Sequence, residues 1–378
     1  MAIKKQRLPE GSRMYDRLCA ALLLLLFSAG PAIAEPQHRL DITFATTHPP
    51  SLPWVYVVRD FVAPEFVRRM GEQRPDYAVS WLGAWGTLYK WQDSLAGVEV
   101  GVADIGWIGS LWESARLPLQ NMTYALPFIT DDLPALMRVI NRLHETIPAM
   151  RAGWEKYGTE YLGASGVDTY HLLTTFPVNS LDDLRGRKIL APGAAAIWLQ
   201  GTGAIAVDGA LSTYYTQLKT GVAEGTISIL TGAHPFRIHE VAPYVTLVGI
   251  GAQCTGALTA NRRFWQGLPP EARTILRELG PAYSNRAAVD AMGRYENSLQ
   301  AMAAEGAIVS VLPAAEKQRW IEAMPNLARE WVARNEAKGL PARQVLEALI
   351  SELRAEGVEP VFDWTQTLPE PVGIATRQ

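Results

Sequence analysis

Few residues of this chain are spaced for catalysis or for holding a metal. Its six histidines are scattered, and none belongs to the H-E-x-x-H pattern that binds zinc. The sequence also lacks the G-x-S-x-G nucleophile elbow and the phosphate-binding P-loop. Gly249-Ile250-Gly251 is followed by Cys254 where a dinucleotide-binding motif needs a third glycine, so we interpret these glycines as a tight turn. The sequence therefore predicts no catalytic residues, no metal and no cofactor.

The one pair of adjacent acids in a suggestive place has a simpler interpretation. Asp182 and Asp183 precede the turn Leu184-Arg185-Gly186, where a short polar side chain caps a helix. We therefore interpret them as capping residues rather than as a catalytic pair. A periplasmic enzyme stays open as an alternative, but no nucleophile, base and orienting group stand at a spacing that supports it.

The composition is that of a folded, near-neutral protein. The chain has 378 residues, of which 48% are hydrophobic and 19% charged, with a formal net charge of -3. These values exclude a disordered chain and the basic footprint of a nucleic-acid-binding protein. The 12 tryptophans are a heavy load, and flat rings with one polar atom each are suited to line a ligand cleft.

The N-terminus has the organisation of a secretory signal peptide. A basic segment over 1–17 is followed by an apolar run from Leu18 to Gly30 and by the small-x-small site Ala32-Ile33-Ala34. We predict cleavage after Ala34 and export to the periplasm, with Met14 as an alternative start. The run is short for a membrane span, which needs about 20 apolar residues, so an uncleaved anchor is the less favoured alternative. Cys19 leaves with the signal, so Cys254 has no partner for an intramolecular disulfide.

Strand and helix patterns then alternate twice along the chain, which predicts an α/β fold with two lobes. In the first unit we expect strands over 40–45, 77–82 and 102–108, with helices from Pro53 to Met70 and up to Ala96. In the second unit we expect strands over 161–164, 170–174, 187–191, 205–207, 227–230 and 244–248, with helices over 195–200 and 214–220. From about Asn261 onward the pattern is almost wholly helical, and its longest proline-free stretch runs from Tyr283 to Ala304.

Several segments, in their order and spacing, resemble one family. They are Phe44–Trp54 with its His-Pro-Pro turn, Leu95–Ile105, Ala125–Ile129, Leu181–Ile189, Tyr215–Gly225, Val241–Thr246 and Arg263–Pro270. Together they are similar to the periplasmic solute-binding proteins of TRAP (tripartite ATP-independent periplasmic) transporters, of the DctP, C4-dicarboxylate-binding type. The resemblance covers nearly all of the chain after the signal peptide.

The resemblance implies a two-lobed periplasmic binding protein fold, with a ligand cleft between the lobes and a long helix shared by both. It implies lobe I over 35–163 with 252–290 returning to it, lobe II over 164–251 with 291–345 returning to it, and a C-terminal helix and tail over 346–378. Such a protein captures an organic acid and delivers it to the small and large membrane permease subunits. A sensory protein that feeds a receptor stays open as an alternative.

The resemblance also implies where the ligand binds. The expected ligand-binding residues are Thr46, His48, Trp107, Tyr170, His171, Leu190, Pro192, Trp198 and Ser228. The family's strand Lys-Ile-Arg-x-Pro carries an arginine that grips the ligand carboxylate through two parallel hydrogen bonds, but Leu190 stands at that position here. A second family arginine aligns with Tyr170 or His171, and a family asparagine aligns with Ser228.

These departures argue against a small, doubly charged ligand, because a buried anion without a cation is costly. Two explanations stay open: a carboxylate held by backbone amides, hydroxyls and protonated His171, or a more apolar, less charged ligand. We predict a monocarboxylate or an aromatic acid, with its apolar body against Leu190, Tyr170 or Trp198. The alternative is that Arg187 or Arg237 enters the cleft from another direction.

Overall fold

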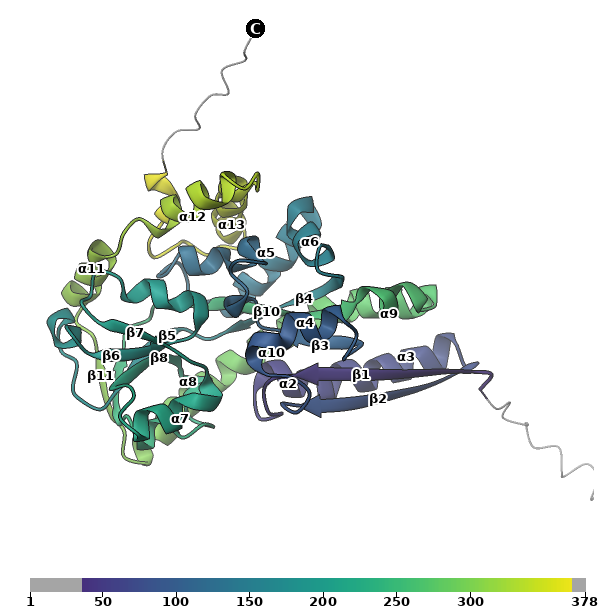
Figure 1. The fold of residues 1–378 in the computed structure, drawn as a ribbon, viewed down its shortest axis with the longest axis horizontal. Helices are drawn as coiled ribbons and strands as arrows, with labels where there is room; N and C mark the ends of the chain where they lie inside the picture. The colour runs from purple at the N-terminus through teal and green to yellow at the C-terminus, as the bar shows by residue number, and fades with distance from the viewer. Residues whose placement is uncertain (1–35, 369–378) are drawn as a thin grey trace, which may run out of the picture.

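The computed structural model describes residues 36–368, and these form two mixed β-sheets joined by a long helix (Figure 1). The predicted signal peptide and its cleavage site lie outside the described residues. The first sheet has the strand order β2-β1-β3-β10-β4. Its strands are β1 (His38–Thr46), β2 (Tyr77–Trp85), β3 (Ile105–Ile108), β4 (Thr159–Val167) and β10 (Gln253–Asn261). The α/β class and the two-sheet organisation agree with the prediction.

Strand β10 was missed by the sequence pattern. It runs antiparallel to both β3 and β4, and all of its residues are buried. Its sequence, QCTGALTAN, is made of small and polar side chains without the alternation of a half-buried strand. Both of its faces are covered, so the pattern that identifies surface-facing strands does not apply to it.

The helices of the first lobe begin where proline or a polar cap favours them. The predicted helix over 53–70 is present as α2 (Pro53–Val57), the π-helical segment η1 (Val58–Val62) and α3 (Ala63–Gln73). The other helical segments of this lobe are η2 (Trp91–Asp93), α4 (Ser94–Glu99), η3 (Ser110–Trp112), η4 (Pro118–Ala125), α5 (Leu133–Thr146) and α6 (Pro148–Glu155).

The second sheet has the order β11-β9-β5-β8-β6-β7. Its strands are β5 (Tyr170–Thr174), β6 (Lys188–Ala191), β7 (Ile205–Asp208), β8 (Gly225–Ile229), β9 (Tyr244–Leu247) and β11 (Ile308–Val311). Its helical segments are η5 (Leu181–Leu184), η6 (Gly193–Leu199), α7 (Leu211–Lys219), α8 (Leu230–Ala233) and η7 (Ile238–Glu240). Ser180 and Asp183 form a capping box at η5, as the capping interpretation predicts for Asp183, whereas Asp182 pairs with Arg185 and Arg319. Strand β11 interrupts the region expected to be helical.

Helix α10 (Pro270–Ala304) is longer than the predicted helix over 283–304, because it continues through Pro281. It follows α9 (Arg262–Gly267) and contacts β4 of the first sheet as well as α8 beside the second (Figure 1). Gly280 of α10 faces Leu162 of β4 so closely that an added Cβ would lie 1.9 Å from the Leu162 carbonyl oxygen. The backbone of the helix therefore packs directly on the backbone of the strand.

The C-terminal helices complete the structure. They are α11 (Ala314–Ala323), α12 (Leu327–Glu336), α13 (Ala342–Ala355) and the short η8 (Trp364–Thr367), with α13 packed against α5 and α12 against η4. The residue boundaries that we expect for the two lobes stay a prediction, and β4 remains in the first sheet as far as Val167.

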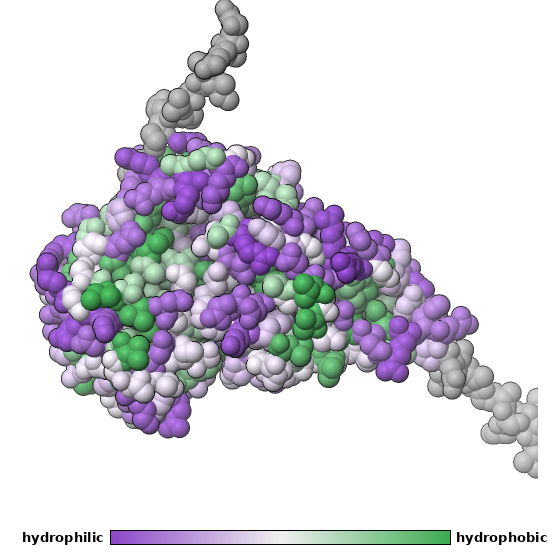
Figure 2. All heavy atoms as spheres, in the orientation of Figure 1, coloured by the Kyte–Doolittle hydropathy of each residue, from purple (hydrophilic) through white to green (hydrophobic). Residues whose placement is uncertain are grey.

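Hydrophilic side chains are spread over the face of the molecule shown in Figure 2. On the face shown in Figure 2, hydrophobic side chains form separate patches among hydrophilic ones. Within residues 36–368, none of the helices has both the length and the hydropathy needed to cross a membrane.

Candidate functional site

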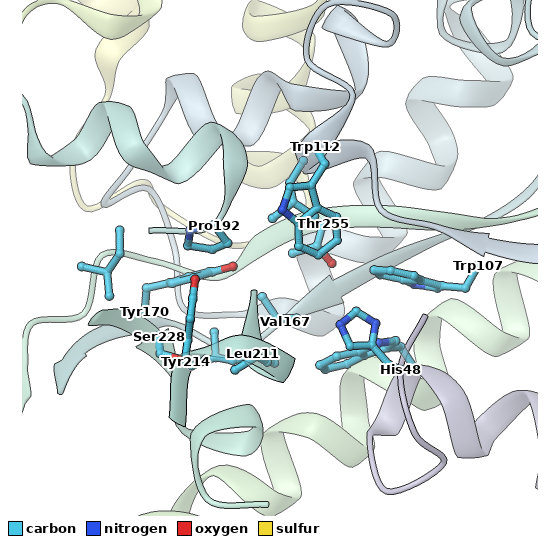
Figure 3. Close-up of a pocket in the computed structure, with 14 residues that line it drawn as sticks. His48, Trp107, Trp112, Val167, Tyr170, Pro192, Leu211, Tyr214, Ser228 and Thr255 are labelled. Atoms are coloured by element: carbon cyan, nitrogen blue, oxygen red, sulfur yellow. The ribbon is translucent and has the colours of Figure 1, made fainter. Parts of the chain in front are cut away.

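A cavity lies between the two sheets and takes its lining from both lobes (Figure 3). The lining residues are His48, Trp54, Trp107, Leu111, Trp112, Val167, Tyr170, Pro192, Leu211, Tyr214, Ile227, Ser228, Ile229 and Thr255. The first lobe contributes the turn after β1, helix α2, the end of β3, segment η3 and strands β4 and β10. The second lobe contributes β5, the residue after β6, helix α7 and β8. A ligand in this cavity would contact both lobes at once.

Five of the nine residues expected to bind a ligand line this cavity. They are His48, Trp107, Tyr170, Pro192 and Ser228. The other four, Thr46, His171, Leu190 and Trp198, lie outside its lining. The sequence did not single out Trp54 or Trp112 as site residues, since most of the 12 tryptophans are expected to be packing residues. The missing information was which of them face one another.

Aromatic rings form one wall of the cavity. The His48 ring meets the edges of Trp54, at 5.7 Å between centroids, and of Trp107, at 5.1 Å. It also stacks on Trp112 at 6.3 Å. The rings therefore form an apolar wall of ring faces and edges, which suits a planar or apolar ligand body.

Lining residues of the cavity also carry neutral hydrogen-bond donors without partners. The indole Nε1 atoms of Trp54 and Trp112 and the Oγ of Ser228 are buried and make no hydrogen bond to other residues in 36–368. By contrast, Nε1 of Trp107 donates to Oγ of Ser165 at 2.8 Å. A buried polar atom without a partner is costly, so a ligand oxygen that accepts from these donors would remove that cost.

No Asp, Glu, Lys or Arg belongs to the described lining. Burial lowers the pKa of His48 to about 4, so its imidazole is neutral near pH 7. The two arginines considered as substitutes for the family's clamp are engaged elsewhere. Arg187 donates to Glu224 at 2.6 Å, and Arg237 donates to Glu240 at 2.6 Å; both guanidinium groups are exposed. The alternative in which one of them enters the cleft is therefore wrong for this structure.

His171 does not have the role expected of it. Successive residues of a strand point to opposite faces, so Tyr170 lines the cavity and His171 points away from it. Its Nδ1 accepts hydrogen bonds from the backbone N–H groups of Val248, at 3.0 Å, and Gly249, at 3.1 Å. Burial lowers its pKa to about 3. The expectation of a protonated His171 that holds the ligand carboxylate is therefore wrong, since the buried imidazole is neutral and already bonded.

Leu190 also lies away from the cavity lining. It is fully buried in the core of the second lobe with Leu173 and Leu218, and its carbonyl oxygen accepts from the Thr226 hydroxyl at 3.1 Å. The prediction that Leu190 lines the ligand site is therefore not supported, because its side chain points into this core.

Trp198 and Thr46 stand behind the lining. Trp198 stacks on Tyr124 with ring centroids 5.2 Å apart, meets Tyr170 edge-on, and donates its Nε1–H to the Tyr124 carbonyl at 2.9 Å. The Thr46 hydroxyl accepts from the backbone N–H of His48 at 3.3 Å. Both residues therefore support side chains of the cavity rather than line it.

Asp168 lies between β4 and β5, at the point where the chain passes from one sheet to the other. Its buried carboxylate accepts hydrogen bonds from the backbone N–H groups of Leu230, at 3.0 Å, and Thr231, at 3.3 Å, and from the Thr231 hydroxyl. Burial outweighs these donors and raises the pKa of Asp168 from 3.8 to about 6.

This raised pKa predicts a pH-dependent stability. The folded protein keeps a proton that the unfolded chain releases between about pH 4 and pH 6, so the stabilising contribution is complete below about pH 4 and is lost as the pH rises through 6. We expect the wild-type advantage in unfolding free energy over Asp168→Asn to shrink across this window and to stay constant above pH 7. Urea unfolding of both proteins at several pH values measures it, and a difference independent of pH would contradict the prediction.

Comparison of the sequence with known proteins finds a matching family and a related protein that covers most of this chain. The family described as bacterial extracellular solute-binding protein, family 7 (DctP), matches residues 83–335. The C4-dicarboxylate-binding periplasmic protein DctP of Rhodobacter capsulatus is 26% identical over 334 residues, which are 87% of this chain and 97% of that protein.

Solved structures share the fold at low sequence identity. A TRAP solute-binding protein from Rhodoferax ferrireducens, in complex with copurified benzoate, matches with a TM-score of 0.73 and 19% identity, covering 84% of this chain and 98% of that one. A marine metagenome TRAP solute-binding protein specific for aromatic acid ligands, in complex with 3-hydroxybenzoate, also matches with a TM-score of 0.73 and 19% identity, covering 84% and 99%.

Proposed function

Since the chain belongs to family 7 of the bacterial extracellular solute-binding proteins, the DctP family of TRAP transporters, we propose that it captures a monocarboxylate or an aromatic acid in the cavity between its lobes. The family is periplasmic, and its members bind solutes rather than catalyse reactions. The further proposal is that the protein, cleaved after Ala34, delivers its ligand to the small and large subunits of a membrane permease.

The observation that carries this proposal is the combination of aromatic rings, neutral donors and missing charges in one cavity. Indole N–H groups of Trp54 and Trp112 and the hydroxyl of Ser228 would donate to a single carboxylate. The rings of His48 and Trp107 would cover an apolar or aromatic body. A second carboxylate would find no cation among the lining residues, and its desolvation would go uncompensated.

The comparisons support the same ligand class without deciding it. Proteins of this fold have been solved with benzoate and with 3-hydroxybenzoate, and also with pyroglutamic acid, as in DctP7 of Bordetella pertussis. The relative from Rhodobacter capsulatus is named for C4-dicarboxylates. These ligands define the panel that a binding experiment must separate.

Calorimetry on the mature chain tests the proposal, after unfolding and refolding to remove any copurified ligand. Benzoate, 3-hydroxybenzoate and pyroglutamate form one arm, and succinate, malate and fumarate form the other. We expect at least one monocarboxylate to bind about 30-fold or more tightly than any dicarboxylate, as a loss of about 2 kcal/mol or more per unpaired carboxylate requires. Submicromolar binding of succinate or malate would overturn the proposal.

The donors of the cavity give a second prediction. With the tightest monocarboxylate of the panel as probe, we expect Ser228→Ala to weaken binding about 3- to 10-fold, which corresponds to one neutral hydrogen bond. Ser94→Ala is the matched control, because the Ser94 hydroxyl is also buried without a partner but does not line the cavity. Equal effects of the two substitutions in calorimetry would show that Ser228 does not contact the ligand.

A further inference from the structure

The segments that connect the two lobes meet at the side chain of His171. The chain leaves the first sheet through Asp168 and Thr169, between β4 and β5, and returns to it through residues 248–252, between β9 and β10. Helix α10 passes alongside and contacts both lobes. His171, the second residue of β5, bonds to the returning segment and to α10 at the same time.

The bonds of His171 fix the position of its proton. Two backbone N–H groups, of Val248 and Gly249, point at Nδ1, and a backbone N–H can only donate. The neutral ring therefore carries its proton on Nε2, which lies 2.7 Å from the hydroxyl oxygen of Tyr295 on α10. His171 thus donates to Tyr295 and accepts from the returning segment, so every polar atom of the ring is used.

We call the place where β5, residues 248–252 and α10 meet at His171 the junction. Backbone hydrogen bonds also hold residues 248–252 against the start of β5. The N–H of Ile250 donates to the Tyr170 carbonyl at 3.0 Å, and the N–H of Gly251 donates to the Thr169 hydroxyl at 2.8 Å. Gly249 and Gly251 have positive φ angles of 66° and 112°, a conformation that favours glycine. The tight turn expected at these glycines is therefore part of the connection between the lobes.

We infer that His171 and Tyr295 are positioning residues that set the angle between the lobes and hold Tyr170 in the cavity wall. Tyr170 precedes His171 on β5 and points to the opposite face, so a shift of the His171 ring moves the strand that carries a cavity-lining side chain. The bond to Tyr295 ties that strand to helix α10, which contacts both lobes. The inference deepens the proposed function, but it concerns the ligand-free protein and does not depend on the ligand class.

Three variants distinguish the bond between His171 and Tyr295 from the bonds that His171 accepts from the returning segment. Tyr295→Phe removes only the hydroxyl. His171→Asn keeps an acceptor near Val248 and Gly249 but loses the bond to Tyr295, and His171→Leu loses both. Tyr89→Phe is the matched control, because the Tyr89 hydroxyl donates to the Ala45 carbonyl at 3.0 Å within the first lobe.

Distances between spin labels on the two lobes give the readout. Val100 and Val222 are exposed on the first and second lobes and are replaced by cysteine for labelling; Cys254 is buried and stays unlabelled. In the ligand-free protein we expect Tyr295→Phe and His171→Asn to broaden or shift the distance distribution alike, His171→Leu to change it more, and Tyr89→Phe to leave it unchanged.

The double variant gives the sharpest test. His171→Asn and Tyr295→Phe remove the same bond, so their combination should change the distribution no more than either alone. With the tightest acid of the panel, stopped-flow tryptophan fluorescence should show dissociation about fivefold faster in each single variant, as expected for one neutral hydrogen bond. Circular dichroism checks that each variant is folded. The inference would be overturned by unchanged label distances in all three variants of His171 and Tyr295, or by additive effects in the double variant.

The experiments distinguish a failure of the proposed ligand class from a failure of the positioning role. If no monocarboxylate binds but the label distances change as expected, the positioning role stands and the ligand class is wrong. If the acids bind as proposed but the label distances do not change, the positioning role is wrong.

Discussion

Leu211→Arg is expected to strengthen the affinity of this protein for succinate and malate, which we propose the wild type binds weakly. Leu211 is the first residue of α7, lines the cavity and is only partly buried, so a guanidinium group there can reach the cavity from a position that keeps some contact with solvent. An arginine–carboxylate pair supplies the charge-assisted bonds that the lining otherwise lacks. We expect dicarboxylate binding to tighten about 10- to 100-fold, the range for hydrogen bonds to charged groups.

The control for this prediction is Leu211→Gln, which loses the same apolar contacts and adds a polar group without charge. Calorimetry with succinate and benzoate on the two variants separates charge from packing. If Leu211→Gln binds succinate as well as Leu211→Arg does, the missing charge is not what limits dicarboxylate binding. Position 190, where the sequence alone would place the new arginine, is the wrong choice, because its side chain lies in the core of the second lobe.

Gly280→Ala is expected to be among the most destabilising single substitutions in the chain. A Cβ at this position of α10 would lie 1.9 Å from the Leu162 carbonyl oxygen and 2.5 Å from its carbonyl carbon, and both atoms belong to the backbone of β4. To avoid this overlap, helix α10 must move away from the sheet, and this movement opens the packing between α10 and β4. We expect a loss of about 4 kcal/mol or more in unfolding free energy, the size of the largest single-substitution effects.

The same substitution elsewhere on the same helix should have the opposite sign. An added Cβ at Gly293 meets no atom within 4 Å, so Gly293→Ala should stabilise the helix by about 0.5–1 kcal/mol through its higher helix propensity. Chemical denaturation of the two variants measures both effects. Comparable stabilities would show that α10 does not pack on β4 as closely as the structure has it.

Much of the architecture could be predicted from the sequence, because local patterns carry it. The alternation of apolar residues located β1, the helix from Pro53 and the strands of the second sheet except β11, and the order of short motifs indicated the family. These signals are local: each depends on residues a few positions apart, on the side-chain periods of strand and helix. Strand β10 escaped, since a strand buried on both faces and built from small side chains has no such period.

Only about half of the expected site residues line the cavity, because the sequence does not record how the strands pack. Motif alignment placed His48, Trp107, Tyr170, Pro192 and Ser228 at the cleft, where the cavity lies. Alignment identifies a position in a strand, but the twist of the sheet and the packing around it decide which neighbour lines a cavity.

The choice between Tyr170 and His171, which the sequence left open, therefore fell to the tertiary structure. The composition determined that this protein has many aromatic rings, and the family resemblance implied that the clamping arginines are replaced. Only the fold brought Trp54 and Trp112 to one wall, kept Arg187 and Arg237 in surface ion pairs, and turned His171 toward Val248, Gly249 and Tyr295. Contacts between residues so distant in the chain depend on how whole elements pack, and no local pattern records that packing.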